Sequence, residues 1–123
     1  MFYGKWLFTG YNADMMNARL GNLHYQSYAI LLRSNSIHCS CVYRRDDAIE
    51  CGMYDVNMKA YEDWEFLIRL LHNKHLVCYD PHISLYYRQF EQSMSSYGHQ
   101  HYEEIYNYIM TKNKKIYDEV LNG

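Results

Sequence analysis

The sequence predicts a single mixed α/β domain, and three observations support this prediction. The chain has 123 residues, which is a usual length for one domain. Hydrophobic residues make up 49% of it, enough to bury a core. Stretches in which apolar and polar residues alternate are interspersed with stretches of helical spacing, but without the full set of βαβ units of a parallel fold.

The first half of the chain is predicted to hold short strands and two short helices. Glycines and asparagines scattered through the opening favour strands joined by turns. Asp46 and Asp47 can cap a short helix that Gly52 would end. The predicted elements are one or two strands within residues 1–23, a helix over 25–33, a strand over 37–44 and a helix over 48–51.

Two helices dominate the second half. Apolar residues cover most sides of the helix predicted over residues 62–73, so we expect it to be buried. A long amphipathic helix is predicted over residues 102–121, where isoleucines and a valine recur at helical intervals. Between the two helices we predict strands over 75–79 and 83–90, a turn at Asp80 and Pro81, and a loop over 92–98.

Charge and hydropathy argue against several classes of protein. The net charge is only −2 without a long block of one sign, unlike the basic face of a nucleic-acid-binding protein. No stretch approaches the roughly 20 apolar residues of a membrane span, and no secretory signal opens the chain. We therefore expect a cytoplasmic protein. The basic run at residues 112–115 reads as a solvated helix face, with contact to the inner membrane surface as the lesser alternative.

Tyrosine and cysteine are the distinctive residue types. The 15 tyrosines can line a half-wet cleft or an interface, because each has an apolar ring and a polar hydroxyl. Without an export signal, the four cysteines are expected to be free buried thiols. Cys39 and Cys41 would share one face of a strand, as two zinc ligands could. A zinc site needs about four ligands, however, and the chain has no second close pair.

The adjacent acids at the start of the apolar helix are the first candidates for chemistry. Glu62 and Asp63 can be explained by the helix N-terminus alone, which favours negative charge and offers free N–H groups. Alternatively, Asp63 is a general base held rigidly at the mouth of a buried helix. The residues by themselves leave both explanations open.

Three arginines form a second candidate group. Arg44 and Arg45 end a predicted strand, and Arg88 lies within an aromatic one. Guanidinium groups suit the recognition of diphosphates or carboxylates. Pairing with nearby surface acids is the simpler explanation for Arg45, and both explanations stay open for Arg88.

Four segments, in order, resemble the family 2 glycosyltransferases, and they cover about residues 35–97. They are Ser-Cys-Val-Tyr-Arg-Arg at 40–45, similar to S-x-V-F-R-R; Cys-Gly-Met-Tyr-Asp at 51–55, similar to G-G-F-D-E; Tyr-Glu-Asp-Trp-Glu-Phe at 61–66, similar to E-D-W-D/E; and Tyr87-Arg88 with Ser93-Met94-Ser95, similar to Y-R-x-H-x-x-S-x-S.

The resemblance implies a GT-A fold, here a partial mixed sheet flanked by helices. It implies transfer of a sugar from a nucleotide-sugar donor to an acceptor hydroxyl with inversion, in bacterial cell-surface polysaccharide synthesis. Asp63 then matches the catalytic base, and Glu62 and Trp64 would shape the acceptor pocket. Arg88 would lie near the diphosphate or a closing loop, and Arg44 would also contribute to substrate binding. A divalent metal, magnesium or manganese, is expected for the complete enzyme.

Two departures limit what the resemblance implies. The nucleotide-binding region that ends in an Asp-x-Asp metal motif is not among these residues, and Phe90 replaces the histidine after Tyr-Arg. Residues 1–123 are therefore expected to be one domain, the acceptor-side half of a transferase. Alone it would bind no metal, would be inactive, and would expose apolar surface that favours self-association.

Two other classes of function compete with the transferase. The first is a non-catalytic domain that binds a glycan or a protein partner through a tyrosine-rich face. The second is a small interaction domain in which the motif match is due to chance.

Overall fold

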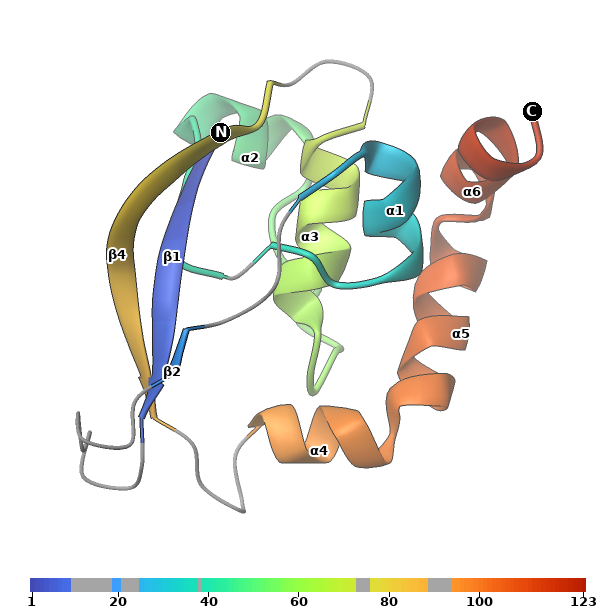
Figure 1. Cartoon of the computed structure of the whole chain (residues 1–123). Helices are drawn as coiled ribbons and strands as arrows, with labels where there is room; N and C mark the ends of the chain where they lie inside the picture. The colour runs from blue at the N-terminus through green and yellow to red at the C-terminus, as the bar shows by residue number, and fades with distance from the viewer. Residues whose placement is uncertain (10–18, 21–24, 38, 73–75, 89–93) are drawn as a thin grey trace.

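The computed structural model describes residues 1–9, 19–20, 25–37, 39–72, 76–88 and 94–123, with the backbone alone for 2–9, 19–20, 80–88 and 94–95. Figure 1 shows a sheet on one side, a central helix, α3 (Glu62–Leu70), and two C-terminal helices on the other side, α5 (Tyr102–Lys112) and α6 (Lys114–Leu121). The remaining helices are α1 (Tyr28–Arg33), α2 (Arg45–Glu50) and α4 (Met94–Gln100).

The sheet is mixed and is built around β1 (Phe2–Thr9). β4 (Cys78–Arg88) runs parallel to β1 along its whole length, from the pair Phe2 and Cys78 to the pair Thr9 and Arg88. The short strands β2 (Arg19–Leu20) and β3 (Cys41–Val42) pair antiparallel with the end and the start of β1. The parallel pair brings two carboxyl-terminal strand ends to one edge of the sheet.

The turn predicted at Asp80 and Pro81 is wrong, because β4 is a single strand that continues through both residues. The register explains how the strand accepts a proline. Gly4 of β1 is opposite Asp80, but Lys5 is opposite Ile83, so two residues of β4 bulge out of the ladder. A proline has no N–H to donate and is tolerated at such a bulge.

The strand predicted over residues 37–44 is also largely wrong. Among the described residues of this range, only Cys41 and Val42 pair with a neighbouring strand. Before them, the N–H of Cys41 donates to the carbonyl of Cys39 at 2.9 Å, a tight turn that prevents an extended course. Apolar and polar residues do alternate in this segment, but β1 pairs with it only through Phe2 and Tyr3.

The short helix α2 ends as predicted, at the left-handed glycine Gly52 with φ 96°. The N–H of Met53 reaches back to the carbonyl of Ala48 at 3.0 Å, and the N–H of Gly52 reaches that of Ile49 at 3.1 Å. These two bonds are a Schellman cap, which glycine favours.

The predicted loop at 92–98 is wrong from Met94 onwards, where α4 begins, while residues 92 and 93 lie outside the described residues. The predicted C-terminal helix is broken into α5 and α6 at Asn113. The Asn113 amide is buried and donates to Glu65 Oε2 at 3.0 Å and to the carbonyl of Ile109 at 3.1 Å. An asparagine that makes such bonds competes with the helical backbone pattern.

Helix α3 forms the centre of the core, as the apolar pattern predicted. Trp64, Phe66, Leu67 and Ile68 are at most 1% exposed. They pack with buried side chains of α1, α5 and α6, including Leu31, Leu32, Ile109 and Tyr117. None of the helices in the described part of the chain is long and apolar enough to cross a membrane.

One acid of α3, Glu65, is fully buried within this core and is held by four hydrogen bonds. Arg69 donates to both of its carboxylate oxygens at 2.8 Å, Lys112 Nζ lies 3.1 Å from Oε1, and Asn113 donates to Oε2. Burial alone would raise the pKa of Glu65, but these hydrogen bonds and the positive charge of Arg69 together lower it. Glu65 therefore remains ionised inside the core.

The same network reaches the turn after α2. Arg69 also donates to the carbonyls of Cys51 and Met53, each at 2.6 Å. Lys112 Nζ lies 3.0 Å from Asp55 Oδ2, which also accepts the hydroxyl of Tyr108 at 2.7 Å. The Tyr108 hydroxyl, the N–H of Asn57 and Lys112 lower the pKa of Asp55 to about 2. Glu65 and Asp55 thus tie α3, the turn after α2, and α5 together.

Glu65→Gln should destabilise the chain strongly, because the half-buried Arg69 guanidinium would lose the buried anion that compensates it, while Lys112 would keep only its ion pair with Asp55. Removal of one partner from a buried ion pair costs about 3–5 kcal/mol. The free energy of unfolding in urea measures the loss. Glu103→Gln, an exposed acid of α5, is the matched control and should change the value by less than about 0.5 kcal/mol. Equal, small effects of both variants would contradict the role given to Glu65.

Candidate functional site

The acid pair Glu62 and Asp63 forms the first turn of α3. The residue before them, Tyr61, is the N-cap and has a left-handed backbone with φ 58° and ψ 20°. Asp63 Oδ1 accepts the N–H of Trp64 at 2.9 Å. The positive end of the helix dipole and the free N–H groups of the first turn stabilise negative charge at this position.

Asp63 lies within electrostatic reach of Cys39, Cys41 and Tyr54. Burial is the main cause that raises the pKa of Asp63, and the nearby charge of Glu62 raises it further. The hydrogen bond from the Trp64 N–H lowers this pKa in part. Burial also raises the pKa values of the neighbouring groups, that of Cys41 to about 11, and the negative charge of Asp63 adds to the effect. At neutral pH the two thiols and the Tyr54 hydroxyl are therefore neutral groups around a partly desolvated carboxylate.

Glu62 adds an acceptor to the same turn. Its Oε2 atom is buried and has no hydrogen-bond partner in the part of the chain that the structure describes. Buried polar atoms are nearly always paired, so this oxygen is suited to a donor from outside the described residues. The hydroxyl of a bound molecule is one such donor.

Trp64 lies in the core rather than in contact with solvent. Its side chain is fully buried, and Nε1 donates to the carbonyl of Leu31 at 2.7 Å. A buried Trp64 cannot contact an acceptor directly, but it can support the first turn of α3 on which an acceptor would bind. The role of Trp64 in substrate binding stays a prediction, limited to this indirect support.

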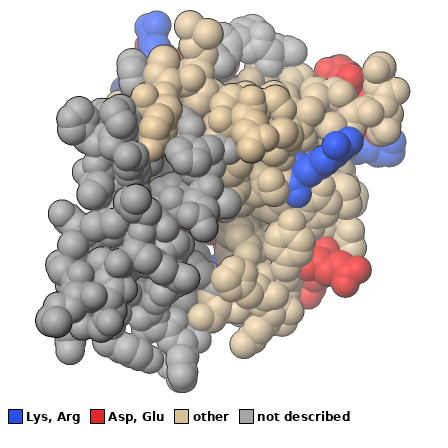
Figure 2. Space-filling view, in the orientation of Figure 1, with Lys and Arg blue, Asp and Glu red and all other residues tan. Residues whose placement is uncertain are grey.

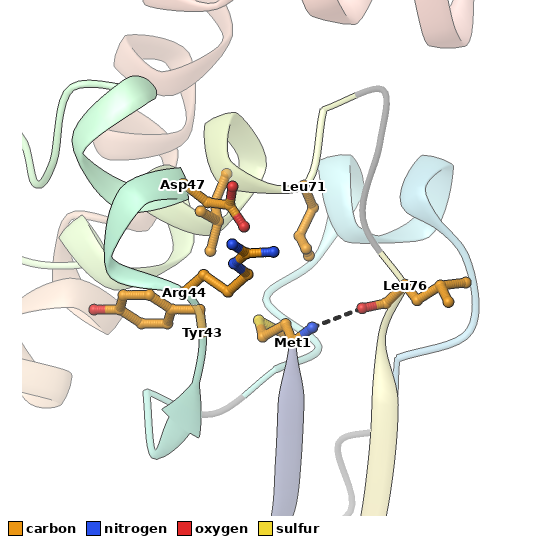
Figure 3. A pocket seen from close by; sticks show the side chains of 7 residues that line it. Met1, Tyr43, Arg44, Asp47, Leu71 and Leu76 are labelled. Carbon is orange, nitrogen blue, oxygen red and sulfur yellow. Dashed lines mark hydrogen bonds between the residues drawn. The ribbon is translucent and has the colours of Figure 1, made fainter.

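Arg44 belongs to a different part of the molecule. It lines a pocket of about 350 Å³ together with Met1, Tyr43, Asp47, Leu70, Leu71 and Leu76 (Figure 3). The pocket adjoins the C-terminal end of α3, seven residues after Asp63, which corresponds to about 10 Å along a helix axis. The structure therefore does not bring Arg44 and Asp63 into one site. In Figure 3 the Arg44 guanidinium points towards the Asp47 carboxylate.

The acid pair is the better candidate site, although the pocket is the better-formed hollow. The pocket walls are mainly apolar, and its charged groups face each other. By contrast, the acid pair combines a desolvated carboxylate with an acceptor oxygen that has no partner among the described residues. An ionisable group with a perturbed pKa and a specific charged neighbour is a common mark of functional sites.

Arg88 is the last residue of β4 and is paired with Thr9, but its side chain lies outside the described residues. Figure 1 shows the carboxyl ends of β1 and β4 at the same end of the molecule as the start of α3. In open α/β sheets, ligands bind outside the carboxyl ends of parallel strands. The backbone of Arg88 is therefore at the same end of the fold as the acid pair.

The sequence did not reveal the neighbours of Asp63. The sequence suggests Cys39 and Cys41 only as zinc ligands and Tyr54 only as part of the segment at 51–55, and it connects none of them with residue 63. No local pattern links positions so far apart in the chain. Asp55, which falls in one of the four resembling segments, contacts Tyr108 and Lys112 and has a structural role in this chain.

The metal implied by the resemblance does not fit the described residues. Within them, no group of three His, Cys, Asp or Glu side chains could hold a metal ion. His38 and the segment around Phe90, where the family histidine would stand, lie outside the described residues.

Comparison with known proteins adds no further constraint: no protein-family model, curated protein or solved structure matches this chain. The fold and the site therefore rest on the residues and their geometry.

Asp63→Asn should stabilise the chain at pH 7. The pKa of Asp63 is higher in the folded state than its ordinary 3.8, so the ionised form lowers stability as pH rises above that value. A substitution that removes such an unfavourable charge typically raises the free energy of unfolding by about 0.5–2 kcal/mol. Urea unfolding at pH 7 and at pH 3 measures the difference.

At pH 3 both states of the native chain hold the Asp63 proton, so the variant and the native chain should then differ little. The exposed Asp118→Asn is the matched control and should show no gain at pH 7. A variant that is less stable than the native chain at pH 7 would contradict the burial cost assigned to Asp63.

Proposed function

We propose that this chain is the acceptor-side part of an inverting glycosyltransferase, with Asp63 as its general base. The observation that carries the proposal is the coincidence of two independent features. One of the four segments that resemble the family contains Glu62 and Asp63, and the same two residues form the half-buried acid pair at the start of α3. A helix cap alone does not account for the buried Glu62 oxygen that lacks a partner among the described residues.

In the proposed reaction, the acceptor hydroxyl lies against Asp63. As its oxygen bonds to the anomeric carbon, the bond from that carbon to the donor diphosphate breaks, and the hydroxyl proton passes to the Asp63 carboxylate. A raised pKa makes this carboxylate a better base than an exposed aspartate. Glu62 Oε2 accepts a hydrogen bond from a second hydroxyl of the acceptor, which orients it for in-line attack.

The remaining partners of the reaction follow from the resemblance. The donor is a nucleotide sugar, and its binding region with the Asp-x-Asp metal motif and magnesium or manganese is a separate segment. The acceptor is a glycan or a lipid-linked glycan of cell-surface polysaccharide synthesis at the cytoplasmic side of the membrane. We expect that segment or a second copy of the chain to cover apolar surface of this part.

The second candidate function is non-catalytic glycan binding. It is favoured by an aromatic cluster close to Glu62, in which Tyr102 is 41% exposed and its ring stacks on Trp64 and Tyr106. Aromatic rings of this kind can pack against sugars. Nucleic acid is not supported as a partner: Figure 2 shows charged side chains of both signs among the described residues of one face.

Asp63→Asn should abolish sugar transfer in the protein that joins this chain to its nucleotide-binding region. Loss of a general base costs typically about 10²–10⁴-fold in rate. Turnover of a nucleotide sugar with a glycan acceptor is the measurement, and Asp118→Asn is the control that should keep full activity. The rate should also fall in acid, as pH drops through the raised pKa of Asp63.

Two outcomes would decide between the candidates. Unchanged turnover in Asp63→Asn would refute the base. Glycan binding that survives Asp63→Asn but is lost in Tyr102→Ala, without any transfer by the native protein, would favour the binding domain instead.

A further inference from the structure

The backbone of Tyr61 is unusual for the residue that begins a helix. A helix N-cap is normally extended, and its side chain commonly caps the first turn. Tyr61 instead has the left-handed backbone described above, and its side chain makes no capping bond. For a bulky residue this conformation is uncommon and persists only where the surroundings hold it in place.

Three neighbours hold the Tyr61 ring. Trp64 and Tyr102 each meet it edge to face, with centroids 5.8 Å away. Trp64 is itself fixed by its bond to the Leu31 carbonyl. On the third side lies Gly98 of α4, which is buried. A Cβ atom at that position would lie 2.8 Å from Tyr61 Cε2 and 3.0 Å from Cζ, closer than real contacts allow.

Gly98 therefore has a specific reason to be glycine. Glycine within a helix is less favourable than alanine, so its presence in α4 calls for a packing reason. The close approach of the α4 backbone to the ring supplies it. Because the ring already contacts Trp64 and Tyr102, a methyl group at position 98 would have to displace either α4 or Tyr61 itself.

We propose that Gly98 and Tyr61 are positioning residues for the acid pair: α4 rests on the Tyr61 ring through Gly98, and this contact holds the left-handed backbone that directs Glu62 and Asp63. Tyr61 immediately precedes Glu62, so its φ and ψ set the direction in which the first turn of α3 leaves the loop. The buried Ala60 fixes the other side of the same junction. The catalytic consequence rests on the proposed function, but the positioning itself does not.

The test compares Gly98→Ala with Gln100→Ala, an exposed position of the same helix. The readouts are the melting temperature and the titration midpoint of the Asp63 carboxyl, followed by carbon NMR in the full chain. Gly98→Ala should lower the melting temperature, although alanine favours helix. It should also move the Asp63 midpoint down towards that of an ordinary aspartate, because a loosened first turn admits water. Gln100→Ala should change neither readout.

Tyr61→Ala provides the second variant in case Gly98→Ala does not fold. Alanine removes the ring contact and, unlike glycine or asparagine, does not favour a left-handed backbone by itself, so the first turn of α3 is released. The Asp63 midpoint should again move down. An Asp63 midpoint equal to the native one in folded Gly98→Ala or in folded Tyr61→Ala would overturn the proposal, since plain packing would lower the melting temperature without moving the midpoint. Sugar transfer by Asp63→Asn tests the proposed function separately.

Discussion

The buried ion-pair network around Glu65 is the constraint on which the rest of the structure depends. A carboxylate in the core is tolerated only when its hydrogen bonds and charge are satisfied. This need is met by hydrogen bonds from Arg69, Lys112 and Asn113. Arg69 lies on α3 itself, Lys112 on α5, and Asn113 between α5 and α6. As a result, the rotation of α3, the position of the turn after α2 and the break between α5 and α6 are set together. The first turn of α3, with the acid pair, is one end of that fixed helix.

The three acids of the segment Glu62-Asp63-Trp64-Glu65 therefore have different roles. Glu65 is ionised and compensated, so it contributes to stability. Asp63 is partly desolvated without a cation beside it in the described residues, so its charge costs stability. Glu62 has one buried oxygen without a partner in the described part of the chain. Such a pair of acids beside a compensated one suggests a function for them, and proton transfer from an acceptor hydroxyl is the function we propose.

Features set by neighbouring residues could be predicted from the sequence, and features set by distant ones could not. The apolar pattern predicted α3, and Gly52 predicted the end of α2, because both signals are local. The break at Asn113 depends on Glu65, 48 residues earlier, and the bulge at Pro81 depends on the register with β1. Helix α4 has no clear apolar period; its place against Tyr61 could be seen only in three dimensions. In the site, the two acids were predictable, but the Cys41 and Tyr54 neighbours of Asp63 were not.

The central claim is that the environment separates the pKa values of acids that lie close together in α3. A pH titration of the native chain, with the side-chain carboxyl carbons followed by NMR, tests it most directly. The account predicts that Asp63 titrates above the ordinary aspartate value of 3.8, while Glu65 titrates below its ordinary 4.5. The opposite order, with Asp63 below its ordinary value and Glu65 above it, would contradict both the compensated core acid and the proposed base.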